Sequence, residues 1–151
     1  MTQQDSEFDC VVDASVGIKL FLKEPLADRA DALFTHLSDD PPAHFYVPDL
    51  FFIECANILW KHVRRFRYPA HIAIQQIADL ATLRVRPTAM QSLAEDALLL
   101  AIKYGCSTYD AAYVVMATRF SVPLITADEA LIRIFSKTAF DIRFLGDWPA
   151  L

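Results

Sequence analysis

The chain has 151 residues, a length that suits one domain over residues 1–151 and that can bury a core without a disulfide or a structural metal. Hydrophobic residues make up 54% and charged residues 22%, which excludes a disordered chain; the high apolar share also indicates a surface for self-association. The net charge of −5 counts against nucleic-acid binding through overall basicity, because proteins that neutralise phosphates are more often basic.

The cysteines and the amino-terminal segment indicate a reducing compartment. Cys10, Cys55 and Cys106 lie far apart and form no CxxC pair, so they predict neither a zinc site nor a disulfide framework. The polar start MTQQDSEFD does not resemble a signal peptide, and no apolar run approaches the ~20 residues that a membrane span requires. We expect a cytoplasmic protein with reduced thiols and no membrane association.

Short apolar runs alternate with longer helical patterns, which predicts an α/β protein with a central, mostly parallel five-stranded sheet. The expected strands are Phe8–Val12, His44–Val47, Leu83–Arg86, Val122–Thr126 and Phe140–Phe144. The expected helices cover residues 15–21, 25–37, 48–67, 69–80, 88–104, 107–120 and 128–137, followed by a tail at 146–148. Gly105 is expected as the C-cap of the helix that ends at Tyr104.

Two aspartates follow predicted strands. Asp13 comes directly after the first strand, and Asp128 comes two residues after the fourth. Functional groups of an open parallel sheet gather beyond the carboxyl ends of the strands, so both side chains are expected at one edge. Structural interpretations exist as well. Asp13 can cap the next helix, and Asp128 can be a first-turn acid beside a capping box formed by Thr126 and Glu129.

Glu54 lies in the predicted helix DLFFIECANILWKHV, which is apolar on nearly every side. A partly buried carboxylate needs a partner, because an ionised group away from water costs much free energy. Either a functional site uses this charge or a salt bridge to an Arg or Lys neutralises it. Asn57, one turn further on, lies on the same face of the helix.

Asp110 begins an otherwise apolar helix in STYDAAYVVMA, where Ser107-x-x-Asp110 also matches a capping box. If it converges with Asp13, Glu54 and Asp128, two bare charges ~4 Å apart repel by ~4 kcal/mol at an effective dielectric of ~20. Such a cluster must bind protons or hold a cation. Oxygen ligands without His or Cys suit Mg²⁺ or Mn²⁺, and a carboxylate-held Mg²⁺ can activate a water against a phosphodiester.

The order and setting of these acids resemble those of the PIN-domain ribonucleases, especially the VapC-type toxins of bacterial toxin–antitoxin pairs. The resemblance covers nearly the whole chain, and it lies in the segments VVDASVGIKLFL, YVPDLFFIECANILWK, STYDAAYVVMA and VPLITADEALI. It implies a three-layer α/β/α fold, an RNA substrate, a homodimer, and a small antitoxin protein that blocks the active site.

The resemblance also implies roles for individual residues. The residues that match the family's catalytic acids, which bind one or two Mg²⁺ or Mn²⁺ ions and activate water, are Asp13, Glu54, Asp110 and Asp128. The residues that match supporting polar positions are Ser15, Asn57 and Thr126. Since all four acids are present, the resemblance implies an active enzyme.

The end of the Glu54 helix holds the densest basic stretch of the chain, which consists of Lys61, His62, Arg64, Arg65 and Arg67. These side chains either contact RNA phosphates or form a solvated helix end that suits the helix dipole. Tyr109 and Tyr113 either stack on bases or belong to the core or a dimer contact. The four histidines lack ligand spacing, so none is assigned to the metal.

Two other functions remain open from the sequence. Asp13 can be the nucleophile of a haloacid-dehalogenase-like phosphatase, with Asp128 and Glu129 holding Mg²⁺. That chemistry usually needs a second acid where Ser15 stands, and it leaves Glu54 without a role. The other alternative is a non-catalytic PIN-like binding module. With glycine only at 17, 105 and 146, the chain lacks a GxGxxG, a P-loop and a GxSxG elbow.

Overall fold

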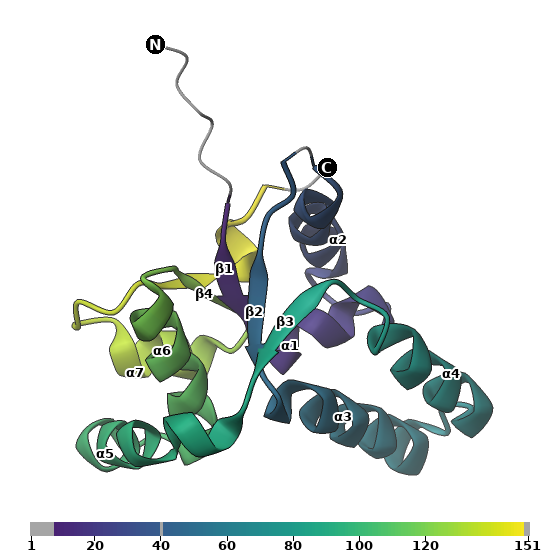
Figure 1. Ribbon diagram of the computed structural model, residues 1–151. Helices are drawn as coiled ribbons and strands as arrows, with labels where there is room; N and C mark the ends of the chain where they lie inside the picture. Colours follow the sequence, from purple (N-terminus) through teal and green to yellow (C-terminus); the bar gives the residue numbers. More distant parts are fainter. Residues whose placement is uncertain (1–7, 40, 150–151) are drawn as a thin grey trace.

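The computed structural model describes residues 8–39 and 41–149, and in this part of the chain five strands form one sheet (Figure 1). The strands are β1 (Cys10–Val12), β2 (Phe45–Pro48), β3 (Val85–Thr88), β4 (Leu124–Thr126) and β5 (Ile142–Phe144). Their order is β3-β2-β1-β4-β5, and every neighbouring pair is parallel. The sequence predicted a mostly parallel sheet of five strands, and the structure confirms it.

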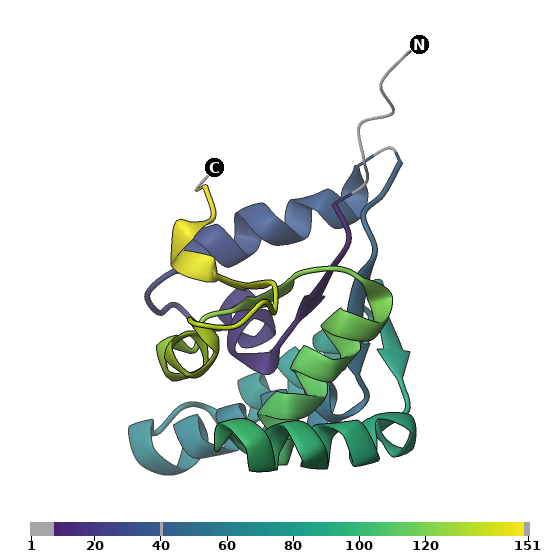
Figure 2. The ribbon, with the colours of Figure 1, turned by 90° about the vertical axis from the view of Figure 1, so that its left-hand side faces the viewer.

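Helices cover both faces of this sheet. The α-helices are α1 (Ala14–Gly17), α2 (Ala27–Thr35), α3 (Leu50–Phe66), α4 (Ala70–Leu80), α5 (Ala94–Tyr104), α6 (Thr108–Phe120) and α7 (Glu129–Phe135). Helices α1 to α4 lie to one side of the sheet and α5 to α7 to the other (Figure 1). Helix α6 packs on β1 and β2, and α5 packs on α6 (Figure 2). The predicted three-layer α/β/α fold is confirmed.

The central strands β1 and β4 are short and, except for Thr126, apolar, because both of their faces are covered. Every residue of β1 is buried, as is every residue of β4. Parallel sheets with helices on both faces bury their strands in this way, so alternation of polar and apolar residues is absent. The edge strand β3 differs: it contains Pro87, which an edge strand tolerates because one side of its backbone needs no ladder partner.

Close packing of α1 against α3 brings the end of β1 near the Glu54 helix. A Cβ atom on Gly17 would lie 2.5 Å from Cζ of Phe51 on α3, nearer than atoms can approach. The glycine therefore lets the first helical turn after β1 pack directly on α3. This contact sets the position of Glu54 relative to the end of β1.

Several predicted boundaries are wrong in ways that have local causes. The helix expected over 15–21 ends at Gly17 and continues as a 3-10 helix, Ile18–Leu20. The helix expected from Pro25 begins at Ala27, because Leu26 adopts a left-handed conformation with φ of 70°. Strand β3 begins two residues later than predicted, since its register pairs Pro87 with Val47.

The remaining differences are smaller. Phe8 and Asp9 precede β1 and do not belong to it. The helix expected from Thr88 is a 3-10 helix, Met90–Leu93, that leads into α5, and the expected tail contains a 3-10 turn, Leu145–Asp147. Gly105 caps α5 with φ of 73°, as predicted. In the described ranges, no helix combines the length and the apolar character that crossing a bilayer demands.

Candidate active site

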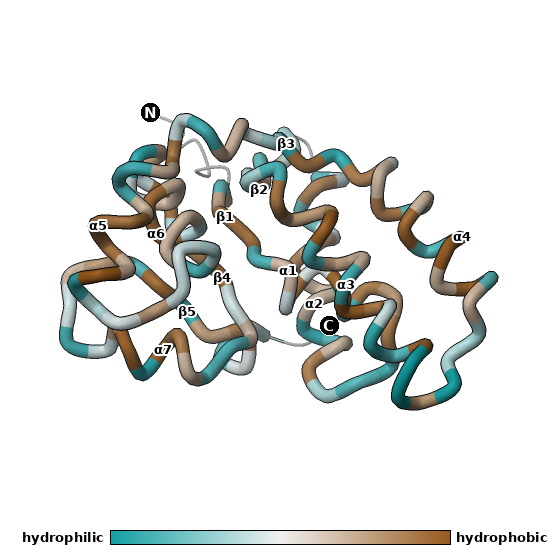
Figure 3. Tube along the Cα trace, turned by 90° about the horizontal axis from the view of Figure 1, so that it is seen from below, coloured by the Kyte–Doolittle hydropathy of each residue, from teal (hydrophilic) through white to brown (hydrophobic). Residues whose placement is uncertain are grey.

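The candidate site lies where β1 and β4 end side by side. After β1 the chain enters α1 in one helical layer, and after β4 it enters α7 in the other layer. The chain therefore continues on opposite faces of the sheet after these two neighbouring strands (Figure 3). Open α/β sheets bind ligands at such a topological switch point, in the crevice beyond the carboxyl ends of the strands. Asp13 and Asp128 follow these two strands, as the sequence predicted from their spacing.

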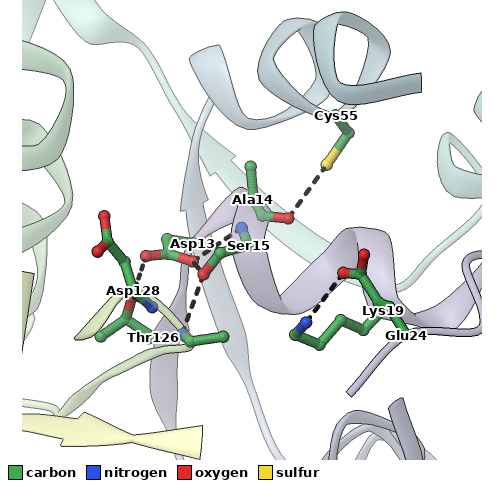
Figure 4. A network of polar contacts seen from close by, with 9 residues as sticks. Asp13, Ala14, Ser15, Lys19, Glu24, Cys55, Thr126 and Asp128 are labelled. Atoms are coloured by element: carbon green, nitrogen blue, oxygen red, sulfur yellow. Dashed lines mark hydrogen bonds and ion pairs between the residues drawn. The ribbon is translucent and has the colours of Figure 1, made fainter. Parts of the chain in front are cut away.

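The side chain of Asp13 is held by two hydroxyl groups. Ser15 donates through both its backbone N–H, at 2.9 Å, and its hydroxyl to Oδ1 of Asp13. The hydroxyl of Thr126, at the end of β4, donates to Oδ2 (Figure 4). Asp13 is also the N-cap of α1, so the capping interpretation and the functional one apply to the same residue.

The same two hydroxyls bind the loop that follows β4. Ser15 Oγ accepts a hydrogen bond from the backbone N–H of Ala127 at 3.0 Å, and Thr126 Oγ1 accepts one from the N–H of Asp128 at 3.0 Å. Each hydroxyl therefore donates to Asp13 and accepts from a backbone N–H of that loop. The end of β1 and the loop after β4 are joined into one rigid unit.

Burial dominates the electrostatics of Asp13, which is only 6% exposed. Loss of water raises the pKa of its carboxyl from 3.8 to about 6; the hydrogen bonds from Ser15 and Thr126 oppose this rise, and the charge of Asp110 adds to it. A buried carboxylate whose hydrogen-bond donors are all neutral keeps its negative charge available to a cation.

Asp128 has a different environment at the neighbouring strand end. It is the N-cap of α7, and its carboxylate accepts hydrogen bonds from the N–H groups of Ala130 and Leu131, at 2.8 and 3.3 Å. The capping box of Thr126 and Glu129 is therefore wrong, because Asp128 itself caps the helix and Thr126 binds Asp13 instead.

Glu54 on α3 is half-buried, as expected, and its partner is a tyrosine. The hydroxyl of Tyr113 on α6 donates to Oε1 of Glu54 at 2.8 Å. Burial raises the pKa of Glu54, the hydrogen bond from Tyr113 lowers it, and the charge of Asp110 raises it. The salt bridge considered from the sequence is not formed: across residues 8–39 and 41–149, Glu54 pairs with no Lys, Arg or His.

Asp110 connects the other acids electrostatically. It lies in the first turn of α6, where its N–H donates to Ser107 Oγ at 3.1 Å, so Ser107 is the N-cap. Burial raises the pKa of Asp110, the hydrogen bond with Ser107 lowers it, and the charge of Asp128 raises it. Since Asp110 in turn raises the pKa of both Asp13 and Glu54, the four predicted acids form one electrostatic group.

The chemistry of this group fits a hard divalent cation. All its donors are carboxylate oxygens, and their repulsion is not relieved by any Lys, Arg or His ion pair within the described residues. In this same part of the chain, no three His, Cys, Asp or Glu side chains lie close enough together to form a complete set of metal ligands. The carboxylate oxygens of Asp13, Glu54 and Asp128 instead accept hydrogen bonds from hydroxyl and N–H groups.

The other residues predicted for the site are exposed on α3 or at its end; Asn57 is one turn from Glu54, and the basic residues lie farther along the helix. The exposed basic side chains around the end of this helix are those of Lys61, Arg64, Arg65 and Arg67. Ten residues separate Glu54 from Arg64, which is about 15 Å along a helix axis.

The structure also separates the two tyrosines. Tyr109 is 58% exposed, whereas Tyr113 is buried and therefore cannot stack on a base. No role for Tyr113 at Glu54 was predicted from the sequence, although its position three residues after Asp110 puts both on one face of α6. That spacing is the signal that would have found it.

Most of the chain is similar in sequence to one protein family. The PIN domain model matches residues 10–139. The chain is 33% identical over 129 residues to Ribonuclease VapC3 of Pyrobaculum aerophilum, an alignment that covers 83% of this chain and 93% of that protein.

Solved structures agree in fold. A protein from Pyrobaculum aerophilum superposes with a TM-score of 0.67 at 24% identity, covering 91% of this chain and 84% of that one. A toxin–antitoxin complex from Klebsiella pneumoniae gives 0.63 at 16% identity, with coverages of 90% and 97%. VapC20 of Mycobacterium tuberculosis, a toxin that cleaves the sarcin–ricin loop, gives 0.63 at 17% identity, with coverages of 87% and 95%.

A parallel α/β sheet with acids at its switch point defines the class of open α/β domains that bind their ligands beyond the strand ends. The extent of the family match and the identity to a VapC ribonuclease place this chain more narrowly: it belongs to the PIN domain family.

Proposed function

We propose that the protein is a metal-dependent endoribonuclease and the toxin of a toxin–antitoxin pair. The observation that carries this proposal is the state of Asp13: a buried carboxylate, held by Ser15 and Thr126 and electrostatically joined to three further acids. Burying uncompensated negative charge costs stability, so a protein retains it where a cation uses it. Homology to a VapC ribonuclease makes an RNA phosphodiester the proposed substrate.

Asp13, Glu54, Asp110 and Asp128 are the residues proposed to hold Mg²⁺ or Mn²⁺. When bound, the cation supplies an activated water and stabilises negative charge on the leaving oxygen. The protein's own contribution is orientation. The hydroxyls of Ser15 and Thr126 fix both oxygens of Asp13, and the cap of α7 fixes Asp128. Asn57 is proposed as a polar support on the outer part of the same helix as Glu54.

One region supports binding of the RNA backbone. The exposed side chains around the end of α3 supply positive charge for phosphates; they are Lys61, Arg64, Arg65 and Arg67. The cleft of about 510 Å³ beside Asp128 does not add to it, because its Lys19 is paired with Glu24 at 2.9 Å and its Arg133 shares the lining with Asp128 and Glu129. The basic end of α3 concentrates cations locally and so answers the objection raised by the net charge of −5.

Exposed apolar faces support protein partners. Leu99 and Ile102 on α5 are 61% and 73% exposed, and Trp60 and Ile74 on α3 and α4 are 56% and 73% exposed. Faces of this kind mark interaction surfaces. We propose a homodimer and an antitoxin as the partners, and a cytoplasmic location in which the free thiols stay reduced. Residues 1–151 are proposed to act as one domain.

RNA cleavage by purified protein tests the proposal. The wild type is compared with Asp13→Asn, which removes a charge without changing volume, in Mn²⁺, in Mg²⁺ and in EDTA. Asp31→Asn is the matched control, because Asp31 is an exposed aspartate on α2. The expected result is discrete RNA fragments that form only with metal. Asp31→Asn should produce them at the wild-type rate, and Asp13→Asn at a rate at least about 100-fold lower.

A phosphomonoester substrate run in parallel separates the alternatives. Hydrolysis of the phosphomonoester with RNA left intact would establish the phosphatase and contradict the nuclease. Equal cleavage by Asp13→Asn and the wild type would remove Asp13 from the active site.

A further inference from the structure

Tyr113 joins the two helical layers at the candidate active site. It comes from α6 and is 1% exposed, and its hydroxyl donates to Oε1 of Glu54, which comes from α3. We propose that Tyr113 is a positioning residue that holds the Glu54 carboxylate in the orientation in which the acid group binds its cation. This inference rests on the proposed function, because it assigns Tyr113 a role toward the same metal.

The hydrogen bond is well placed to fix an orientation. Tyr113 is surrounded by buried residues along α6, so its ring has little freedom to move. Since the bond occupies Oε1 of Glu54, it leaves Oε2 for another partner. Asp110 lies one turn before Tyr113 on the same helix face, so α6 brings both an acid and a hydrogen-bond donor to Glu54.

The chemical character of the donor matters as much as its place. An Arg or Lys beside Glu54 would cancel the carboxylate charge, whereas a neutral phenol orients the carboxylate and leaves its charge for a cation. A phenol hydroxyl carries its proton at neutral pH, so Tyr113 is a neutral donor to Glu54. Ser15 and Thr126 bind Asp13 in the same way, since their hydroxyls are neutral donors to a buried carboxylate.

A purely structural role makes a different prediction. Buried tyrosine hydroxyls usually find a hydrogen-bond partner, and losing that bond lowers stability whatever Glu54 does. A structural role therefore affects the melting temperature and leaves the affinity for metal unchanged. A positioning role affects the metal affinity and requires Glu54.

Mn²⁺ binding to the full chain without RNA, measured by calorimetry and by electron paramagnetic resonance, tests the proposal. Tyr113→Phe keeps the ring and removes only the hydroxyl. The control is Tyr104→Phe, because Tyr104 packs against Phe135 and Phe140 and is not part of the acid group. We expect the dissociation constant for Mn²⁺ to rise about 10-fold or more in Tyr113→Phe, as when a residue that orients a metal ligand is lost, and to stay unchanged in Tyr104→Phe.

The Glu54→Gln background shows whether the effect passes through Glu54. There, adding Tyr113→Phe should change Mn²⁺ affinity by less than about 2-fold, because the carboxylate that it positions is gone. A second measurement keeps the tyrosine hydroxyl in place: in 3-fluorotyrosine-labelled protein, Mg²⁺ should shift the ¹⁹F signal of Tyr113 and leave that of Tyr104 unmoved.

Each result has a definite meaning. Unchanged Mn²⁺ affinity in Tyr113→Phe, an equal loss in the Glu54→Gln background, an unmoved Tyr113 signal, or a wild type that binds no Mn²⁺ would each overturn the role of Tyr113. A wild type that binds Mn²⁺ but leaves RNA intact would overturn the nuclease alone. RNA cleavage that persists while Tyr113→Phe binds Mn²⁺ normally would overturn only the tyrosine's role.

Discussion

The ends of β1 and β4 lie side by side, but the aspartates that follow them differ in burial and in electrostatics. Asp13, after β1, is 6% exposed, accepts hydrogen bonds from two side-chain hydroxyls and one backbone N–H, and has a pKa raised to about 6. Asp128, after β4, is less buried and accepts two backbone N–H groups at the start of α7. Asp13 therefore costs the fold stability when ionised, whereas Asp128 contributes to it as a helix cap.

This contrast shows that an acid's position after a strand does not reveal its energetic role. A cap is explained by the helix that it begins, so Asp128 would be stabilising in a protein of any function. Asp13 caps the short helix α1 as well, but a cap does not account for its burial or for its raised pKa. Within the acid group, Asp13 is consequently the residue whose environment indicates function most directly.

The largest expected effect on stability is that of Asp13→Asn. The carboxyl ionises near 3.8 in the unfolded chain and near 6 in the folded one, so wild-type stability falls as the pH rises through this window and stays low above it. The difference between these pKa values corresponds to up to about 3 kcal/mol. In EDTA, Asp13→Asn should be more stable than the wild type at pH 7.5 by up to this amount.

Urea unfolding of both proteins at pH 7.5 and at pH 4 measures this difference. The advantage of the variant should disappear at pH 4, where the wild-type carboxyl is protonated in the folded state. A variant that is less stable than the wild type at pH 7.5 would show that the hydroxyls of Ser15 and Thr126 more than offset the burial of the charge.

A smaller effect is expected at Asp128, where two substitutions separate capping from charge. Asp128→Ala removes the cap of α7 and should lower the free energy of unfolding by about 1 kcal/mol. Asp128→Asn keeps a capping side chain and should cost only a few tenths of that amount. RNA cleavage should fall in both variants alike, because both remove the charge. Full cleavage by Asp128→Asn would reduce Asp128 to a structural cap and would remove it from the acid group.

The smallest effect is expected at the basic end of α3, which lies far from the acids. Arg64→Gln and Arg65→Gln should weaken RNA binding modestly, and each lost phosphate contact should reduce the slope of log K against log salt by about 0.7. Binding is measured by fluorescence anisotropy in the Asp13→Asn background, which prevents cleavage, with exposed Lys137→Gln as the control. A slope equal to that of the control would leave these arginines as a solvated helix end.

Much of the fold could be predicted because its signals are local. Five apolar runs separated by helical patterns indicate a parallel α/β sheet, and Gly105 and Ser107 mark the end of α5 and the start of α6 through their own backbone preferences. The boundaries that were wrong, as at Leu26 and Pro87, depend on a left-handed residue and on the register of an edge strand. Those are set by neighbours in space and leave no regular pattern in the chain.

The sequence by itself determined which acids are candidates, because Asp13 and Asp128 follow strands, and Glu54 and Asp110 are acids in otherwise apolar helices. Only the tertiary structure decided how each acid is held. The partner of Glu54 is 59 residues away in the chain, and that of Asp13 on β4 is 113 residues away. Hydrogen bonds and burial depend on distances in space, which packing of the two helical layers creates, so the neutral donors at Asp13 and Glu54 became visible only in the folded protein.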